Sequence, residues 1–323
     1  MALWAGIDEA GYGPLLGPLV VSGTVFRVSD AVPAREGFLW AELKSAVARG
    51  LKSADGRVVV DDSKRLYNRT RGIRVLEEGV LSFLGTLGVR PASCGQLFAA
   101  TLPPHCRAQD GAPWWSSVPE LPLPRRSNAS ALASKTADLL QACRRSGTSL
   151  VAARAEVVLP AQFNQTVERT GNKATLLFQK CGALLRAVWE EAEGEDACVL
   201  VDRHGGRMRY RRLLKDAFPE CSCDIVREEA EGSVYRITDG PRTMVVGFKE
   251  GAEARALPVA LASMTAKYLR ELYMEAFNAY WQGRMEGLRP TAGYARDARR
   301  FLADIEPLLR GGQVDLSTLV RTR

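Results

Sequence analysis

The chain has 323 residues, of which 46% are hydrophobic and 25% are charged, as is ordinary for a globular protein. This length allows one large domain with insertions or two domains, and the composition excludes collagen-like, coiled-coil and wholly disordered chains. Forty-four lysines and arginines against 37 aspartates and glutamates give a net charge of +7, which is compatible with a polyanionic partner.

Membrane and secretory segments are not expected. No segment reaches the roughly 18 consecutive apolar residues of a membrane span, and Asp8 and Glu9 interrupt the apolar run that a signal peptide would need. The seven cysteines are an odd number without a C-x-x-C pair, and only two histidines accompany them. This disfavours a disulfide framework and a zinc site, so we expect reduced, mostly buried thiols in a cytoplasmic protein.

The predicted elements begin with two strands. A strand at 3–8, a turn rich in glycine and proline, and a strand at 18–28 open the chain, and the Asp-Asp-Ser sequence caps a helix within 61–88. The later elements are strands at 149–159, 197–201 and 221–226, a hairpin at 234–248 around Asp239-Gly240, and helices at 172–193, 258–282 and 295–309. The tight first turn predicts antiparallel pairing and the helical crossovers predict parallel pairing. The fold class is therefore α/β, with a mixed sheet flanked by helices.

The segment 91–147 differs from its surroundings, because it is rich in proline, serine and alanine and has helical periodicity only at 129–145. Its simplest interpretation is a surface insertion between two core elements. The alternative is an accessory binding element that uses Trp114, Trp115, Arg125 and Arg126.

The most informative segment covers residues 6–18, Gly-Ile-Asp-Glu-Ala-Gly-Tyr-Gly-Pro-Leu-Leu-Gly-Pro. Asp8 and Glu9 end the first predicted strand, where a regular strand points them to opposite faces and a strand end that bends can bring both near one site. Gly11 and Gly13 let the backbone approach a ligand closely. Prolines intrude and a strand follows, which excludes a dinucleotide fingerprint, and no Gly-Lys-Ser/Thr closes a phosphate-binding loop. Taken alone, the segment is most simply a hairpin with solvated acids.

A third acid, Asp202, directly follows the apolar run 197–201, which predicts a strand buried on both faces. Open α/β sheets bind their ligands at such strand ends. The stretch 203–215 then holds six lysines or arginines, Arg207 and Arg209 among them, and no acid. A basic stretch beside a catalytic acid suits a phosphate backbone, and a solvated basic helix is the alternative.

The fourth acid, Glu271, lies on the predicted helix 258–282, where it shares one face with Ser263 and Lys267. A surface pair between Lys267 and Glu271 is the plain alternative. Four carboxylates from three elements, with almost no histidine or reactive cysteine nearby, favour hard divalent ions such as Mg²⁺. Two such ions about 4 Å apart activate a water and stabilise the leaving oxygen in phosphodiester cleavage.

In their order along the chain, these motifs resemble the type 2 ribonuclease H family, ribonuclease HII. The resemblance covers 1–90 and 149–310 and leaves 91–148 outside it. The residues that carry it are Gly6 to Pro18 with Val20-Val21, Asp62-Ser63-Lys64-Arg65-Leu66, Val199-Leu200-Val201-Asp202, Ala262 to Glu271, and Gly293-Tyr294.

This resemblance implies a ribonuclease H-like catalytic domain over 1–283, with an insertion at about 91–148, and a small helical C-terminal extension over 284–323. It implies endonucleolytic cleavage of RNA paired with or joined to DNA, leaving 5′-phosphate and 3′-hydroxyl ends. The implied cofactors are two divalent ions, Mg²⁺ or Mn²⁺, and the implied partner is nucleic acid in DNA replication and repair. We expect a monomer.

By motif match, the metal ligands and catalytic residues are Asp8, Glu9, Asp202 and Glu271. The turn Gly11-Tyr12-Gly13 falls where the family recognises the ribose 2′-hydroxyl, and Tyr294 falls where a tyrosine packs against the nucleotide at an RNA–DNA junction. Together with the basic stretch, this gives a set of substrate-binding residues: Gly11, Tyr12, Gly13, Ser63, Lys64, Arg207, Arg209, Lys267 and Tyr294.

The chain departs from the family pattern in several places. Tyr12 stands where the family usually has arginine or lysine, which exchanges a charged donor for a hydroxyl and a stacking face. Glu271 stands where ribonuclease HII usually has aspartate, and the hairpin at 234–248 is foreign to the family. Two rivals stay open: a DNA-directed nuclease of the same fold, and a catalytically silent nucleic-acid-binding protein. Four carboxylates facing a polyanion speak against the second.

Overall fold

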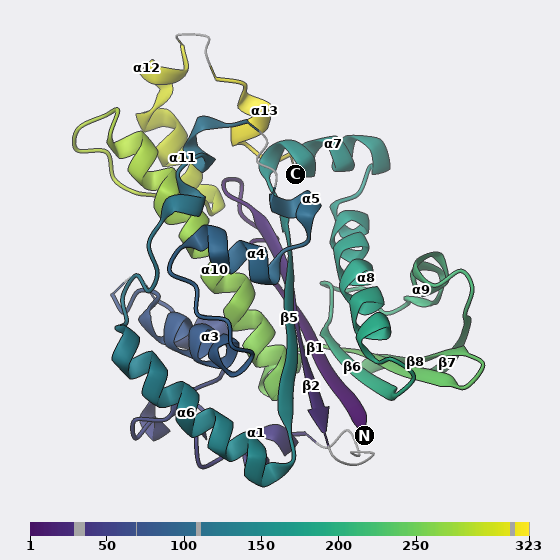
Figure 1. Cartoon of the computed structure of the whole chain (residues 1–323). Coiled ribbons are helices and arrows are strands. Elements are labelled where there is room, and N and C mark those ends of the chain that lie inside the picture. The colour runs from purple at the N-terminus through teal and green to yellow at the C-terminus, as the bar shows by residue number, and fades with distance from the viewer. Residues whose placement is uncertain (29–35, 69, 108–110, 311–313, 323) are drawn as a thin grey trace.

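A seven-stranded mixed sheet forms the centre of the computed structural model, which describes residues 1–28, 36–68, 70–107, 111–310 and 314–322. The strand order is β5-β2-β1-β6-β9-β8-β7 (Figure 1). β1 pairs antiparallel with β2 and parallel with β6, so the expected mixed sheet is confirmed. The strands are β1 (Ala2–Ala10), β2 (Leu19–Val28), β5 (Ser149–Val158), β6 (Asp196–Asp202), β7 (Ser222–Glu229), β8 (Gly232–Asp239) and β9 (Arg242–Lys249).

One edge of this sheet collects the carboxyl ends of several strands. β1, β6 and β9 are mutually parallel, and β7 runs the same way because two antiparallel pairings, with β8 between them, connect it to β9. The expected acids Asp8, Glu9 and Asp202 therefore share an edge with the end of β7.

Helices cover both faces of the sheet. α8 packs on one face with α9, and α10 packs on the other with α3 and α6. The contact of α10 with β1 is so close that a Cβ on Gly6 would lie 2.2 Å from the backbone nitrogen of Val259. None of the described helices is long and apolar enough to cross a bilayer. These helices are α3 (Arg74–Thr86), α6 (Ala129–Ser146), α8 (Lys173–Glu191), α9 (Arg211–Ala217) and α10 (Leu257–Gln282).

The expected helix within 61–88 is two helices, α2 (Ser63–Leu66) and α3. Asp62 caps α2 by accepting a hydrogen bond from the backbone of Lys64. The chain turns extended at Tyr67, and Gly72 has a φ of 65°, a left-handed conformation that interrupts helical geometry. The interruption turns α2 toward the strand ends.

The segment 91–148 is folded into the core. In addition to α6, which covers the expected helix, it contains two helices that were not expected, α4 (Cys94–Thr101) and α5 (Pro104–Arg107). Trp114 and Trp115 are fully buried and pack against Phe277 of α10, so they form no binding surface.

A buried carboxylate fastens the end of this segment. Glu77 of α3 accepts hydrogen bonds from the backbone nitrogens of Arg125, Arg126 and Ser127 and from the hydroxyl of Tyr268. Four donors satisfy a carboxylate that has no solvent exposure.

The C-terminal residues lie against the turn between β1 and β2. The backbone nitrogen of Arg321 donates to Leu15, its guanidinium donates to the carbonyl of Pro14, and Val320 forms a bridge with Leu16. Asn164 binds the same segment through the carbonyl of Val320. This C-terminal strap follows α11 (Ala295–Asp304), α12 (Glu306–Leu309) and α13 (Leu316–Leu319).

The remaining short elements are α1 (Phe38–Glu42), β3 (Val47–Ala48), β4 (Val58–Val59) and four 3-10 helices at Leu51–Ser53, Pro113–Trp115, Val118–Glu120 and Ala252–Ala254.

Candidate functional site

Three of the four expected acids meet at the sheet edge. Asp8 lies on the face that α10 covers, where Ser263 donates a hydrogen bond to its carboxylate. The backbone nitrogen of Glu9 also donates to Asp8, at 2.7 Å. Asp202 ends the neighbouring strand β6 and interacts electrostatically with both Asp8 and Glu9. The parallel pairing of β1 with β6 thus brings the acids together.

The pKa values of these acids are raised. Burial raises the pKa of Asp8, and the charges of Glu9 and Asp202 raise it further. Burial and the charge of Asp202 raise the pKa of Glu9 to about 7. Burial is also the main cause of the raised pKa of Asp202. A buried cluster of like charges at this edge therefore favours the binding of cations.

A fourth acid in the cluster is Glu253, which the sequence analysis did not identify. It lies in the 3-10 turn between β9 and α10, and its carboxylate interacts electrostatically with Asp202. The backbone nitrogen of Ala252 in the same turn donates to Asp202 at 3.0 Å. Burial and the charge of Asp202 raise the pKa of Glu253. The clue in the sequence was an acid just before the helix that carries Ser263.

One lysine accompanies the four acids. The ammonium of Lys64 lies 4.0 Å from Glu253. Burial alone would lower the pKa of Lys64, but the surrounding acids, Asp8 and Asp202 among them, raise it. Ser63 beside it shares a 2.9 Å hydrogen bond with Ser263. The expected Ser63 and Lys64 therefore both border the cluster.

Glu271 lies outside this cluster, which corrects our expectation of it as the fourth ligand. Its carboxylate accepts hydrogen bonds from the hydroxyl of Tyr67 at 2.7 Å and from the ammonium of Lys267 at 2.5 Å. Eight residues of α10 separate it from Ser263, and at 1.5 Å per residue this is about 12 Å along the helix. The strand ends meet the first turns of α10, so an acid two turns later lies beyond their reach.

Glu271 instead lines a groove of about 840 Å³. Lys267 and Tyr294, both expected to bind substrate, line the same groove. The Tyr294 side chain is 50% exposed, and the guanidinium of Arg270 lies 5.6 Å from its ring centroid. The wall on the other side includes Arg126, which the segment 91–148 contributes.

The turn Gly11-Tyr12-Gly13 lies between the acids and this groove. Gly11 has a φ of 88°, and a Cβ there would lie 2.4 Å from the carbonyl oxygen of Pro18, so no other residue fits. A Cβ at Gly13 would meet nothing within 4 Å, which leaves its backbone open to a ligand. The ammonium of Lys173, at the start of α8, lies 5.0 Å from the ring centroid of Tyr12. A cation thus stands beside the tyrosine.

The basic stretch begins at the acid cluster and leads away from it. Arg207 is close enough to Tyr12 to lower its pKa, although burial and Glu9 raise that pKa overall. His204 is buried, and burial together with Arg207 lowers its pKa to about 4, so it stays neutral near pH 7. Arg209 lies further out, 4.0 Å from Glu228 of β7.

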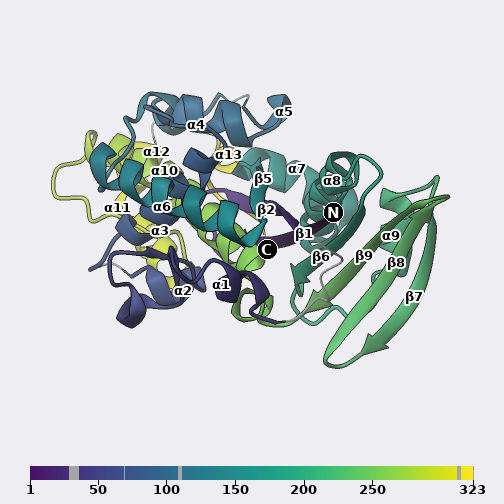
Figure 2. The ribbon, with the colours of Figure 1, turned by 60° about the horizontal axis from the view of Figure 1, so that its bottom comes forward.

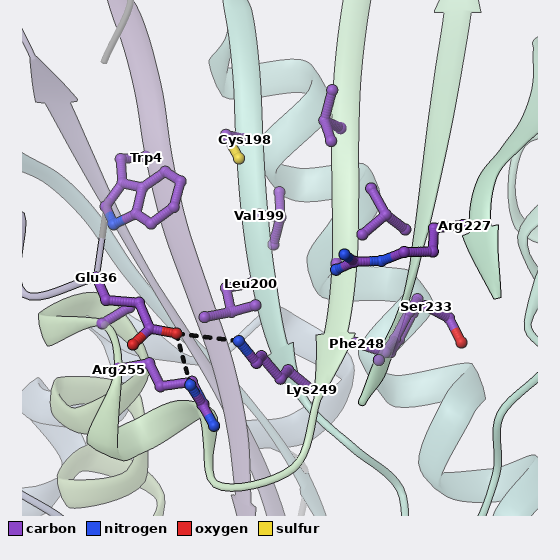
Figure 3. Close-up of a pocket in the computed structure, with 15 residues that line it drawn as sticks. Trp4, Glu36, Cys198, Val199, Leu200, Arg227, Ser233, Phe248, Lys249 and Arg255 are labelled. Carbon is purple, nitrogen blue, oxygen red and sulfur yellow. Dashed lines mark hydrogen bonds and ion pairs between the residues drawn. The ribbon is translucent and has the colours of Figure 1, made fainter. Parts of the chain in front are cut away.

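A small hollow lies on the sheet face that α10 covers, and none of the four acids lines it. It has about 180 Å³, and its walls are largely apolar, with Trp4 and Leu200 among them (Figure 3). Lys249 lies opposite Asp202 in the register of β6 and β9. Its ammonium lies 3.0 Å from the carboxylate of Glu36, which Arg255 also binds. The hollow therefore has a charged rim toward the acid cluster.

A separate group joins His105, Cys106 and Glu156 within 4.8 Å. Lys180 already binds Glu156 at 2.8 Å, and burial raises the pKa of Cys106 to about 11, so the thiol keeps its proton. An ion pair accounts for this group. All seven cysteines are free, as expected.

Comparisons with known proteins found likeness only among solved structures. No family model and no curated protein matches the chain. The ribonuclease HII of Archaeoglobus fulgidus, solved in complex with PCNA, is 17% identical at a TM-score of 0.47, over 99% of this chain and 94% of that one. The ribonuclease H2 of Pyrococcus horikoshii OT3 is 16% identical at 0.47, over 98% and 92%. Bst-RNase HIII with Mn²⁺ is 15% identical at 0.42, over 99% and 66%. With TM-scores below 0.5, the functional argument rests on this chain's own geometry.

Proposed function

We propose that this protein is a metal-dependent endonuclease of the ribonuclease H type, which cleaves RNA paired with DNA or ribonucleotides within DNA. The observation that carries the proposal is the convergence of Asp8, Glu9, Asp202 and Glu253 at one sheet edge, all with raised pKa values. A protein that only binds nucleic acid gains nothing from four clustered, partly buried carboxylates facing a polyanion.

The donor set fits divalent ions that prefer oxygen. The four side chains offer only carboxylate oxygens, which Mg²⁺ and Mn²⁺ favour, and the nearby His204 is held neutral in an aromatic cluster. Bound ions would supply an activated water and a counter-charge for the departing 3′-oxygen. We assign the ligands as Asp8, Glu9, Asp202 and Glu253, with Glu253 in place of Glu271.

The surrounding residues orient this set and the substrate. Ser263 fixes the Asp8 carboxylate by donating a hydrogen bond, and Lys64 offsets part of the negative charge at the cluster. The open backbone at Gly13 suits contact with a ribose 2′-hydroxyl, which distinguishes RNA from DNA. The exposed ring of Tyr294 offers a stacking surface to a sugar or a base.

The test compares three duplexes with the wild-type protein in Mg²⁺ or Mn²⁺: DNA with one ribonucleotide, a full RNA/DNA hybrid, and plain DNA. We expect cleavage of the first two, leaving 5′-phosphates, and loss of cleavage in Asp8→Asn and Asp202→Asn proteins that stay folded. Cleavage of plain DNA alone would favour the DNA-directed nuclease. Binding without cleavage would favour the silent binding protein, and normal turnover by Asp202→Asn would refute the metal site.

A further inference from the structure

Strands β7, β8 and β9 form an extension that stands out from the side of the molecule, with α9 packed against it (Figure 2). The acids lie at the ends of β1 and β6 and in the turn after β9, so β7 and β8 have no direct part in holding them. β7 is the outermost strand of the sheet, and α9 contacts both β7 and α8.

A basic pocket of about 470 Å³ lies between α9 and β7. Its lining contains four cations, two acids and one apolar side chain: Arg209, Arg211, Arg212, Lys215, Asp216, Glu228 and Ile225.

The cations of this pocket are largely unpaired. Arg209 reaches Glu228 only at 4.0 Å, and Arg211 donates to the carbonyl of Cys223 at 3.3 Å. Arg212 and Lys215 form no ion pair with any residue that the structure describes. The hydroxyl of Tyr235 occupies one oxygen of Glu228, and four cations against two acids leave the lining with an excess of positive charge.

The pocket lies at a definite distance from the acid cluster. Three strand spacings separate β7 from β6, which carries Asp202, so the pocket lies about 14 Å across the sheet. Glu228 lies near the carboxyl end of β7, which is the sheet edge where the acids gather. At 3.4 Å per base pair, this distance corresponds to about four base pairs of a duplex.

We propose that this pocket, formed by α9 and β7, binds the phosphate backbone of the duplex about four base pairs from the bond that is cleaved. Arginine forks suit phosphate oxygens, and the stretch from Arg207 to Lys215 connects the pocket with the acid cluster. Ile225 is the one apolar side chain in the lining, which disfavours a peptide that docks through apolar anchors. The proposal rests on the proposed function, since that function supplies the duplex.

The test measures affinity for DNA duplexes with one ribonucleotide at the central step by fluorescence anisotropy, without divalent ions, so that it does not depend on catalysis. One duplex extends about 3 base pairs and the other about 12 base pairs from the central step, so only the longer one reaches the pocket. The variant is Arg212→Gln with Lys215→Gln. The matched control is Arg144→Gln with Arg145→Gln, two cations in the last turn of α6, which removes the same charge. Arg144 lies just before β5 begins, at the sheet edge opposite the acids.

We expect the variant to bind the long duplex at least about 10-fold more weakly than wild type, with a salt slope smaller by about 1.8 for two lost phosphate contacts. Its affinity for the short duplex should equal that of wild type, and the control should match wild type on both duplexes. An equal loss on both duplexes, no loss on the long one, or wild-type binding that does not depend on duplex length would overturn the proposal. Because cleavage is assayed separately, a protein that binds in this way but cuts nothing would refute the nuclease and keep the surface.

Discussion

Asp202 and Glu253 carry like charges close together at the sheet edge. Burial raises the pKa of both carboxyl groups, and the charge of Asp202 raises that of Glu253 further. A divalent ion that binds to them would therefore compete with protons for the same oxygens.

Substitution of Glu253 by glutamine should abolish most of the activity. The amide is neutral, and a lost ligand removes several kcal/mol of charge stabilisation, so we expect kcat to fall by at least about 100-fold. Glu271→Gln is the matched control, because it lies on the groove about 12 Å along α10 and should keep activity within about 10-fold of wild type. Steady-state kinetics on a single-ribonucleotide duplex measures both, and a dead Glu271→Gln enzyme beside an active Glu253→Gln enzyme would reverse our ligand assignment.

The stability of the ion-free protein should fall as the pH rises from about 4.5 to about 7. The pKa of Glu9 is near 7 in the folded chain and ordinary when unfolded, so the folded state binds more protons in this window. The loss is at most about 1.4 kcal/mol per pH unit for one group. Thermal melts across this range test the slope. Millimolar Mn²⁺ should raise the melting temperature most at the upper end, and Asp8→Asn should melt higher than wild type at pH 7 without ions. A flat profile would mean that the acids are well solvated.

The sequence predicted the sheet and three of the clustered acids because both depend on local pattern. Apolar runs that end in Asp8, Glu9 and Asp202 predict strand ends, and parallel pairing brings such ends together. Glu253 was missed because it lies in a short 3-10 turn, where no periodicity indicates which way a side chain points. Glu271 was chosen because it lies on a polar stripe of the predicted helix. Helical periodicity indicates which face a side chain shares, but not which turn of the helix meets the strand ends.

The Tyr12→Arg substitution should shift substrate preference toward a single ribonucleotide relative to a long hybrid. We expect a shift of about 10-fold, because one additional charged hydrogen bond stabilises the complex by about that factor. The new fork could reach a phosphate next to the ribose that Gly13 leaves open. Metal dependence should not change, since no ligand is touched. The ratio of kcat/KM on the two substrates measures the shift, with Lys173→Gln as the control for charge beside the ring. An unchanged ratio would mean that residue 12 points away from the substrate.

Glu77→Gln should destabilise the fold by about 2 to 4 kcal/mol, because the amide nitrogen replaces one oxygen and so faces two of the four donors, either the N–H groups of Arg126 and Ser127 or the Arg125 N–H with the Tyr268 hydroxyl. The neighbour Glu78 makes only partly exposed ion pairs with Arg74 and Lys135, so Glu78→Gln should cost less than about 1 kcal/mol. Urea unfolding of the two variants gives both values. Equal midpoints would show that the clamp on residues 125–127 contributes nothing to stability. No sequence pattern indicated this clamp, since its donors are backbone groups about 50 residues away.

The turn between β1 and β2 is synthesised early, but it is completed by contacts with residues at the other end of the chain. Arg321 and Pro14 bind each other although their positions differ by 307 along the chain. At about 5 to 20 residues per second, a ribosome needs roughly 15 to 60 s to make the chain between them. During this time β1 and β2 can pair as a local hairpin, but the contacts that Gly293 and Arg321 make with the turn do not yet exist. The first hairpin can therefore form early in synthesis, whereas the turn within it is completed only when the C-terminal residues arrive.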